Sequence, residues 1–220
     1  MSLFVTGTDT EVGKTVLAAA LLWRYGGELP LLYWKPVGTG GRAESDVEAV
    51  RSLAGAIAEV REEGYLFEDP VSPHLAARRE GKPIELEWLD RRFFELCQEG
   101  RGLIVEGAGG VLAPLDELGT PMLELPRRWG LPVLVAARSR LGTINHTCLT
   151  LEALRTRGLE VLGVVLVGPP NPDNREAVER FGKVEVLGEL PILDPLEAVT
   201  LARAARELDP KGKLGKHLSP

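Results

Sequence analysis

Cysteine, side-chain amides and long apolar runs are all scarce in this 220-residue chain. The two cysteines, Cys97 and Cys148, each fall in a helix-like segment with no second ligand motif nearby. We therefore expect small core residues of a reducing compartment rather than a disulfide or a metal site. No stretch approaches the roughly 18 apolar residues that a membrane-spanning helix needs. The first apolar run starts at once and leaves no room for a signal peptide, which predicts a cytoplasmic protein with no membrane partner.

Basic residues are also few in comparison with acidic ones. The formal net charge is −6, which disfavours general binding to nucleic acid because that function needs a cationic surface. Only three asparagines and one glutamine accompany 16 prolines. This bias is typical of thermophilic proteins, but genome composition can produce it as well, so the growth temperature stays open.

Short apolar runs alternate with helix-like stretches along the chain. We expect strands near 2–6, 31–35, 102–106, 132–137, 160–167 and 185–190, and helices near 14–25, 45–57, 85–98, 143–157, 173–182 and 196–207. This order predicts one α/β domain over residues 1–208, with a mostly parallel sheet and helices on both of its faces. Residues 64–83 should form a long loop with at most one short helix around 74–78, and residues 209–220 a flexible tail.

The most informative local pattern is Gly7-Thr8-Asp9-Thr10-Glu11-Val12-Gly13-Lys14-Thr15, which joins a predicted strand to a predicted helix. Backbone N–H groups and the positive end of the helix dipole make such a turn a phosphate site. Lys14 would reach the β- and γ-phosphates of a nucleotide, and Thr15 would hold Mg²⁺. Five residues rather than four separate the two glycines, so the loop is a variant P-loop and the domain a P-loop NTPase-like fold. A plain helix start beside a lysine is the less favoured interpretation.

Polar side chains also follow other predicted strands, where ligands of an open α/β sheet bind. Lys35 precedes a glycine-rich turn and is either a second cation for the phosphates or a solvated lysine. Ser45-Asp46 opens a helix, and either residue could be its N-cap; the alternative role of Asp46 is that of a Mg²⁺ ligand. Glu106 ends an apolar strand in the manner of a Walker B acid, which is favoured over a plain strand-end glutamate. Residues 138–146 lead into a helix whose first N–H groups either form a second anion site or are capped by Thr143.

Together these motifs resemble the dethiobiotin synthase family. The resemblance spans nearly the whole chain and is carried by residues 7–15, 35–37, 105–110, 141–146 and 188–191. It implies an ATP-dependent cyclo-ligase of biotin biosynthesis in which 7,8-diaminononanoate (7,8-diaminopelargonate) takes up CO₂ as a carbamate. The γ-phosphoryl group of MgATP converts the carbamate to a carbamic–phosphoric anhydride, which closes to dethiobiotin with release of phosphate. The family also implies a homodimer with the substrate site at its interface.

The same resemblance assigns roles to residues of this chain. Lys35 and Lys14 would be catalytic, stabilising the carbamate and the transferred phosphoryl group. The Mg²⁺ ligands would be Thr15, Asp46 and Glu106. The implied ATP-binding residues are Glu11, Val12, Gly13, Lys14, Thr15, Val16, Asp46, Glu106, Gly107, Ala108, Gly109, Gly168, Pro169, Pro191, Ile192 and Leu193. The implied substrate contacts are Thr10 and Thr39, together with Gly142 and Asn145 from the partner subunit.

One position departs from the family pattern. Where an asparagine that reads adenine commonly ends a strand, this chain has Gly168, and asparagine comes only at Asn171. Asn171 or Asn174 could substitute, backbone groups could suffice, or selectivity for ATP could be relaxed. The alternative function is a partitioning or switch-type P-loop ATPase. Residues 8–11 lack the lysine that such proteins usually carry early in the loop, which favours the ligase.

Overall fold

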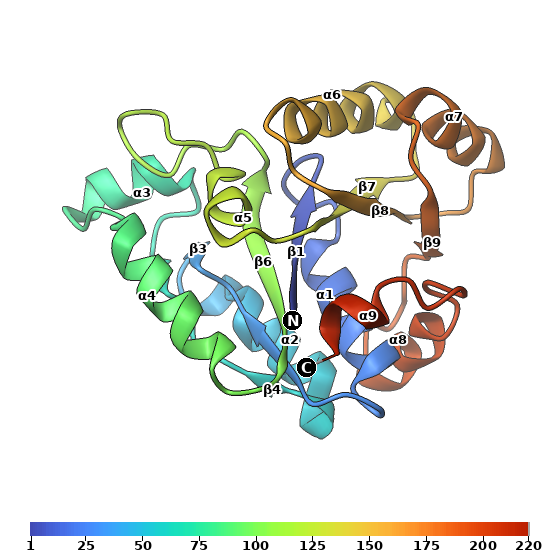
Figure 1. Ribbon diagram of the computed structural model, residues 1–220, viewed down its shortest axis with the longest axis horizontal. Helices are drawn as coiled ribbons and strands as arrows, with labels where there is room; N and C mark the ends of the chain where they lie inside the picture. The colour runs from blue at the N-terminus through green and yellow to red at the C-terminus, as the bar shows by residue number, and fades with distance from the viewer. Residues whose placement is uncertain (220) are drawn as a thin grey trace.

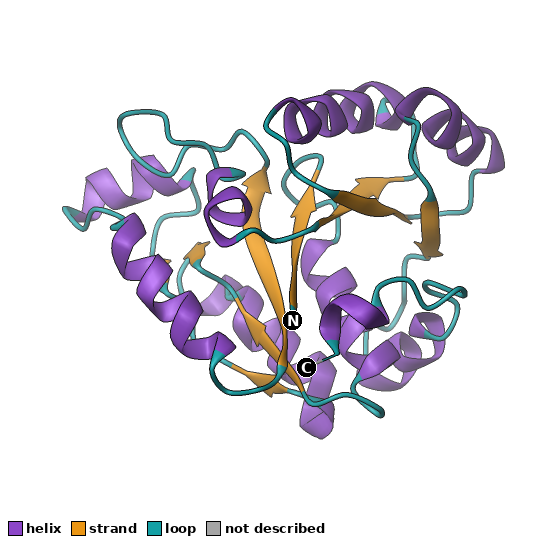
Figure 2. Cartoon of the chain, viewed as in Figure 1, coloured by secondary structure: helices purple, strands orange, loops and turns teal. Residues whose placement is uncertain are grey.

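Seven parallel strands form the central sheet of the molecule (Figures 1 and 2). The computed structural model describes residues 1–219; Pro220, which belongs to the expected tail, lies outside the described residues. The strand order is β4-β2-β6-β1-β7-β8-β9. The bounds are β1 (Ser2–Gly7), β2 (Leu31–Trp34), β4 (Glu59–Val60), β6 (Gly102–Gly110), β7 (Val133–Arg138), β8 (Val161–Val167) and β9 (Val186–Leu190). The predicted fold class is confirmed.

Helices cover both faces of this sheet (Figure 2). One face carries α1 (Lys14–Tyr25), α2 (Asp46–Ala54), α8 (Ala198–Ala205) and α9 (Gly215–Leu218). The other carries α4 (Leu86–Cys97), α5 (Glu124–Trp129), α6 (Thr143–Thr156) and α7 (Pro172–Gly182). Successive strand residues such as Leu3 and Phe4 enter opposite core layers, so a strand buried on both sides is apolar throughout. None of the helices described within residues 1–219 is long and apolar enough to span a membrane.

Several short elements were not expected. β3 (Val37–Thr39) and β5 (Tyr65–Phe67) form a separate two-stranded parallel sheet, so residues 64–83 are not one long loop. The short helix expected around 74–78 is α3 (Pro73–Glu80), which packs against both strands. Single turns of 3₁₀ helix occupy Arg42–Glu44 and Gly55–Ile57. Elements of two or three residues are too short to show a hydrophobic period in the sequence, and so is the six-residue helix α5. The long strand β6 continues four residues beyond Glu106, because Gly110 pairs with Gly7 of β1 after a register shift.

The C-terminal segment packs against the domain, which corrects the expectation of a flexible tail. Leu214 and Leu218 are buried in the core layer beside α1. Asp209 is also buried, and its carboxylate accepts hydrogen bonds from the Tyr25 hydroxyl and from the backbone N–H groups of Lys213 and Leu214. The polar composition of the segment concealed these anchors because only two of its residues are leucines. Part of this segment, α9, lies beside β1, so the two ends of the chain meet (Figure 1).

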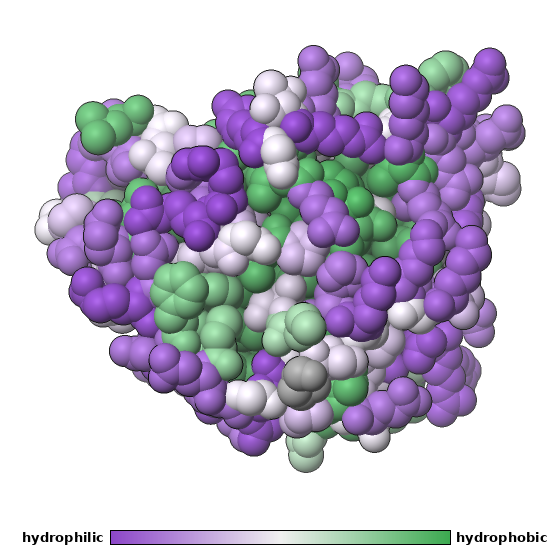
Figure 3. Space-filling view, viewed as in Figure 1, coloured by the Kyte–Doolittle hydropathy of each residue, from purple (hydrophilic) through white to green (hydrophobic). Residues whose placement is uncertain are grey.

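The cysteines are also placed differently from the expectation. Cys97 is exposed and Cys148 only partly buried, so neither is a core residue. On α4 and α6 it is leucines such as Leu96 and Leu151 that turn inward and fill the core. On the face drawn in Figure 3, hydrophilic side chains cover most of the outer surface, and hydrophobic surface lies in a central hollow between α6 and α9 and in a second patch over α4.

Candidate active site

The P-loop leaves the end of β1 and enters α1 with an open helix N-terminus. Gly13 has a φ of 89°, and a Cβ atom there would come within 2.7 Å of Val167 Cγ1, so only glycine fits. As N-cap, Gly13 offers no side chain to the first N–H groups of α1, which leaves them free for an anion. The loop wraps around Lys14, whose Nζ donates a hydrogen bond to the Asp9 carbonyl oxygen at 3.0 Å.

Lys35 lies between two carboxylates that come from different elements. Its Nζ atom is 2.7 Å from Asp46 Oδ2, at the start of α2, and 2.9 Å from Glu106 Oε1, on β6. Strands β2 and β6 are neighbours, and Trp34 pairs with Val105, so the residues that follow each of these meet at one edge of the sheet. Lys35 is therefore a buried site cation and not the solvated lysine of the alternative interpretation.

Thr15 contacts the same two carboxylates. Its Oγ1 atom lies 2.6 Å from Asp46 Oδ1 and 3.0 Å from Glu106 Oε1. The cap of α2 is Ser45, whose hydroxyl accepts a hydrogen bond from the Glu48 N–H at 3.1 Å. Asp46 is therefore not the helix cap, and its carboxylate is free to serve the site.

Burial and mutual charge shift the pKa values of this cluster. Burial, together with the nearby charge of Lys35, lowers the pKa of Lys14 to about 8. Burial alone would also lower the pKa of Lys35, but the carboxylates of Glu106 and Asp46 outweigh it and raise that pKa. Burial tends to raise the pKa of Asp46, and the Lys35 ammonium more than reverses this. Lys35 thus stays charged, whereas Lys14 titrates near pH 8.

The oxygen atoms of Thr15, Asp46 and Glu106 fit a magnesium ion. Mg²⁺ prefers hard oxygen ligands and usually takes one or two protein carboxylates together with phosphate oxygens and water. Among residues 1–219, no three His, Cys, Asp or Glu side chains are grouped so that they could hold a metal by themselves. A metal bound here would therefore need ligands from a nucleotide and from solvent.

Two cavities adjoin the P-loop and share Glu11, Gly13 and Val16 in their walls. The first, of about 680 Å³, contains most of the predicted catalytic, metal and substrate side chains. Predicted residues that line it are Thr10, Lys14, Thr15, Lys35, Thr39, Asp46, Glu106, Ala108 and Gly109. Sequence reasoning missed the part of its wall formed by Glu44, residues 70–73, Gly110 and Ala113. The Ser72-Pro73 pair was a usable signal for a helix start at this part of the wall, because proline favours the first turn of a helix.

The second cavity, of about 590 Å³, is the predicted place of the nucleobase. The predicted residues Val12, Gly168, Pro169, Pro191, Ile192 and Leu193 line it, and Arg138, Ser139, Arg140, Val167 and Leu196 were missed. Asn171 caps α7 by accepting from the Asn174 N–H, and Asn174 Nδ2 donates to the Ser139 carbonyl oxygen at 2.8 Å. Neither asparagine is among the described residues that line this cavity. Both side chains serve local structure, which disfavours the idea that one of them replaces the missing adenine contact.

Three predicted residues lie outside the walls of both cavities, as far as residues 1–219 show. Gly107 contributes its carbonyl oxygen, 3.4 Å from Lys35 Nζ. Gly142 and Asn145 lie at the exposed N-terminus of α6. One chain therefore does not bring these last two to the other substrate residues.

Two unpredicted side chains support the site. The Tyr33 hydroxyl donates to Glu106 Oε2 at 2.8 Å, and burial together with this carboxylate raises the pKa of Tyr33, so the hydroxyl keeps its proton. Arg138 donates to Asp9 Oδ2 at 3.0 Å and to the Thr10 carbonyl oxygen at 2.8 Å, which ties the P-loop to β7. Tyr33 had a sequence signal, since a tyrosine inside a buried apolar strand needs a partner for its hydroxyl.

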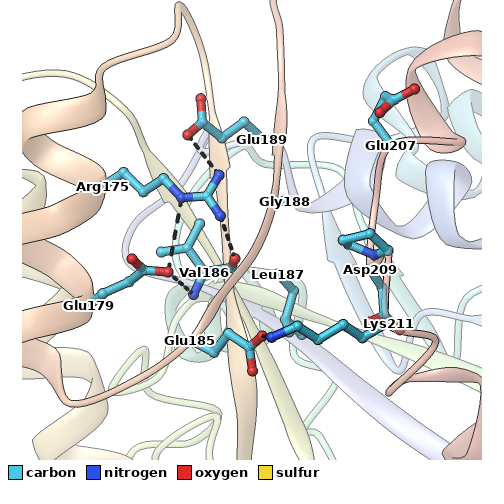
Figure 4. Close-up of a pocket in the computed structure, with 11 residues that line it drawn as sticks. Arg175, Glu179, Glu185, Val186, Leu187, Gly188, Glu189, Glu207, Asp209 and Lys211 are labelled. Carbon is cyan, nitrogen blue, oxygen red and sulfur yellow. Dashed lines mark hydrogen bonds and ion pairs between the residues drawn. The ribbon is translucent and has the colours of Figure 1, made fainter.

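A third cavity, of about 480 Å³, lies at the edge strand β9 (Figure 4). Arg175 pairs with Glu189 and Glu179, and Lys211 pairs with Glu185. Arg175 and Glu179 also bind the backbone oxygen and nitrogen of Val186. These charges compensate one another and cover the strand edge, which indicates a structural role.

Comparison with known proteins identifies relatives over almost the whole chain. A family model described as an AAA domain matches residues 1–200. The ATP-dependent dethiobiotin synthetase BioD of Paramagnetospirillum magneticum is 46% identical over 203 residues, which cover 92% of each chain. The protein of the same name from Nitrobacter hamburgensis is 44% identical over 203 residues, 92% of this chain and 91% of that one.

Solved structures with the same fold are more distant in sequence. The MinC:MinD cell division protein complex of Aquifex aeolicus gives a TM-score of 0.62 at 11% identity, covering 96% of this chain and 94% of that one. The septum site-determining protein MinD complexed with Mg-ADP, from Pyrococcus horikoshii, gives 0.55 at 17% identity over 96% of both chains. At such identities the likeness shows the fold alone.

Proposed function

This chain belongs to the dethiobiotin synthetase family, and we propose that it converts 7,8-diaminononanoate, CO₂ and ATP to dethiobiotin, ADP and phosphate in biotin biosynthesis. The observation that carries the proposal is the meeting of two lysines, two carboxylates and a threonine beside an open helix N-terminus, in a chain 46% identical to a relative named for this activity. Phosphoryl transfer depends on positioning and on neutralising charge, which this set of groups can supply.

We assign separate roles in the reaction to the residues of the first cavity. One amine of the diamine takes up CO₂ to form a carbamate, whose negative charge Lys35 would stabilise. A carbamate oxygen then attacks the γ-phosphorus of ATP, the bond from this phosphorus to the β–γ bridging oxygen breaks, and ADP leaves. Lys14 would neutralise the charge that develops on the transferred group. The second amine attacks the carbonyl carbon of the anhydride and expels phosphate. Because the substrate supplies its own nucleophiles, the reaction needs none from the protein.

The remaining predicted residues would hold the ligands. Thr10 and Thr39 line the first cavity and would contact the diamine. Mg²⁺, held by Thr15, Asp46 and Glu106, would supply positive charge to the triphosphate. The nucleobase would occupy the second cavity, against Gly168 and the backbone around Pro191.

We propose further that the enzyme is a cytoplasmic homodimer. Leu141, which precedes Gly142 and the start of α6, is 97% exposed, and Leu149 on α6 is 57% exposed. These two leucines offer apolar area that a second copy would cover on binding. A second copy placed there would carry Gly142 and Asn145 to the substrate of its partner. Free, partly accessible cysteines agree with a reducing compartment.

The decisive experiment supplies purified protein with 7,8-diaminononanoate, bicarbonate and MgATP, and measures dethiobiotin by mass spectrometry together with ADP. Omitting the diamine or bicarbonate should abolish both products. ATP turnover that is indifferent to the diamine would overturn the proposal and favour the switch-type ATPase. Gel filtration with light scattering tests the dimer, and a monomer at assay concentration would refute it.

A further inference from the structure

Both oxygens of the Glu106 carboxylate have partners in the structure. Oε1 lies 2.9 Å from Lys35 Nζ and 3.0 Å from Thr15 Oγ1, the two groups of the site. Oε2 accepts a hydrogen bond from the Tyr33 hydroxyl at 2.8 Å. Tyr33 and Glu106 are both 0% exposed, so the hydrogen bond between them is shielded from bulk water.

The register of the sheet explains this contact. Tyr33 on β2 pairs with Ile104 on β6, and Glu106 is the next residue of β6 on the same face of the sheet. The tyrosine ring fills the core layer beside α1, and its hydroxyl reaches the carboxylate at the strand end. A phenylalanine would fill the same core space, so the hydroxyl has no packing role.

We propose that Tyr33 is a positioning residue, whose hydroxyl holds the Glu106 carboxylate in the orientation that presents Oε1 to Lys35, Thr15 and the bound metal. The last torsion of a glutamate side chain is only weakly restrained by itself. A hydrogen bond to one carboxylate oxygen therefore selects where the other oxygen points. Partners of metal ligands commonly change metal affinity or activity by about 10- to 100-fold when they are removed. The inference rests on the proposed function, since the metal accompanies ATP.

The test is Tyr33→Phe, with Tyr25→Phe as its matched control. The Tyr25 hydroxyl also donates to a buried carboxylate, that of Asp209, but at the far end of α1. Tyr33→Phe should raise the Mg²⁺ concentration for half-maximal dethiobiotin formation about tenfold. In calorimetry it should reduce the Mg²⁺-dependent gain in ADP affinity by a similar factor and leave metal-free ADP binding unchanged. Tyr25→Phe should lose stability without changing any of these values.

Equal Mg²⁺ dependence of Tyr33→Phe and wild type would overturn the inference, as would the same change in Tyr25→Phe. A wild-type enzyme that makes no dethiobiotin would instead refute the proposed function, and the calorimetric comparison would still test Tyr33.

A second measurement covers the case in which Tyr33→Phe does not fold. The chain has three tyrosines, so fluorine NMR of wild-type protein labelled with 3-fluorotyrosine gives three signals, assignable with Tyr25→Phe and Tyr65→Phe. Adding Mg²⁺ to the ADP complex should shift the Tyr33 signal and leave that of Tyr25 in place. An unmoved Tyr33 signal would overturn the inference.

Discussion

Lys35 Nζ lies 2.9 Å from Glu106 Oε1, in a pair whose side chains are only 3% and 0% exposed. This contact joins the ends of two neighbouring strands and provides a fixed positive charge beside the P-loop. Because Asp46 also contacts the lysine, the ammonium compensates two carboxylates at once. The lysine that we propose to be catalytic is thus also a structural part of the site.

Replacing Lys35 with glutamine should therefore have two effects. Turnover should fall by at least about 10²-fold, because a preorganised charge near the reacting groups is lost. The free energy of unfolding should fall by about 3 kcal/mol, since two carboxylates lose their cation. Dethiobiotin assays and urea unfolding at neutral pH test both effects. A near-normal rate would refute the catalytic role.

Nucleotide affinity should weaken as the pH rises above 8. The pKa of Lys14 in the free enzyme is about 8, so above that value the lysine loses the charge that binds phosphate. The dissociation constant for ADP without metal should rise by up to about tenfold per pH unit. Lys14→Arg, which stays charged, is the control and should show a flat profile. A constant dissociation constant for wild type between pH 7 and 9.5 would contradict the prediction.

The same pKa also predicts how stability depends on pH. Because the pKa of Lys14 in the folded protein lies below its ordinary value of 10.5, the unfolded chain binds more protons between about pH 8 and 10.5. The contribution of Lys14 to the free energy of unfolding should rise with pH across that window. Comparing the unfolding of wild type and Lys14→Met over this range isolates it, and parallel curves would contradict the shift.

Replacing Asp46 should change the Mg²⁺ requirement, whereas replacing its neighbour Ser45 should change only the stability of the fold. Asp46→Asn should raise the Mg²⁺ requirement at least about tenfold, since even partners of metal ligands have effects of this size. Ser45→Ala removes the cap of α2, should cost about 1 kcal/mol of stability and should leave the metal titration unchanged. An unchanged titration for Asp46→Asn would remove it from the metal site.

Base selectivity should be weak. The residues described as lining the second cavity, which include Gly168, contain no asparagine or glutamine. Asn171 does not line it and caps α7. Without a side chain built to read adenine, the kcat/KM values for ATP, GTP and CTP should differ by less than about a hundredfold. Asn171→Ala should lower stability by about 1 kcal/mol without changing these ratios. A strict preference for ATP that Asn171→Ala abolishes would show that Asn171 reads the base.

The C-terminal segment should contribute to stability. Leu218 is fully buried, so Leu218→Ala should lower the free energy of unfolding by about 2–5 kcal/mol. Lys216→Ala, at an exposed position of the same helix, should change it little. Equal stability of both variants would mean that the C-terminal segment does not pack stably against the domain.

The sequence by itself determined the alternating order of the main strands and helices, because strands buried on both faces must be apolar throughout and connecting helices must be amphipathic. It also placed the P-loop, whose glycines, lysine and threonine are neighbours in the chain. Lys35, Asp46 and Glu106 were suggested by their positions at strand and helix ends, where the topology of a parallel sheet gathers polar side chains.

Only the tertiary structure decided how those residues meet. Ser45, three residues before Glu48, is a local signal for the cap of α2, but whether the Asp46 carboxylate reaches Thr15 depends on how α2 packs against α1. Tyr33 reaches Glu106 only because β2 lies beside β6, a pairing of residues far apart in the chain. The buried leucines of the C-terminal segment likewise depend on space left by α1 and β1. Contacts of this kind arise from the packing of distant elements, which short-range sequence periodicity does not record.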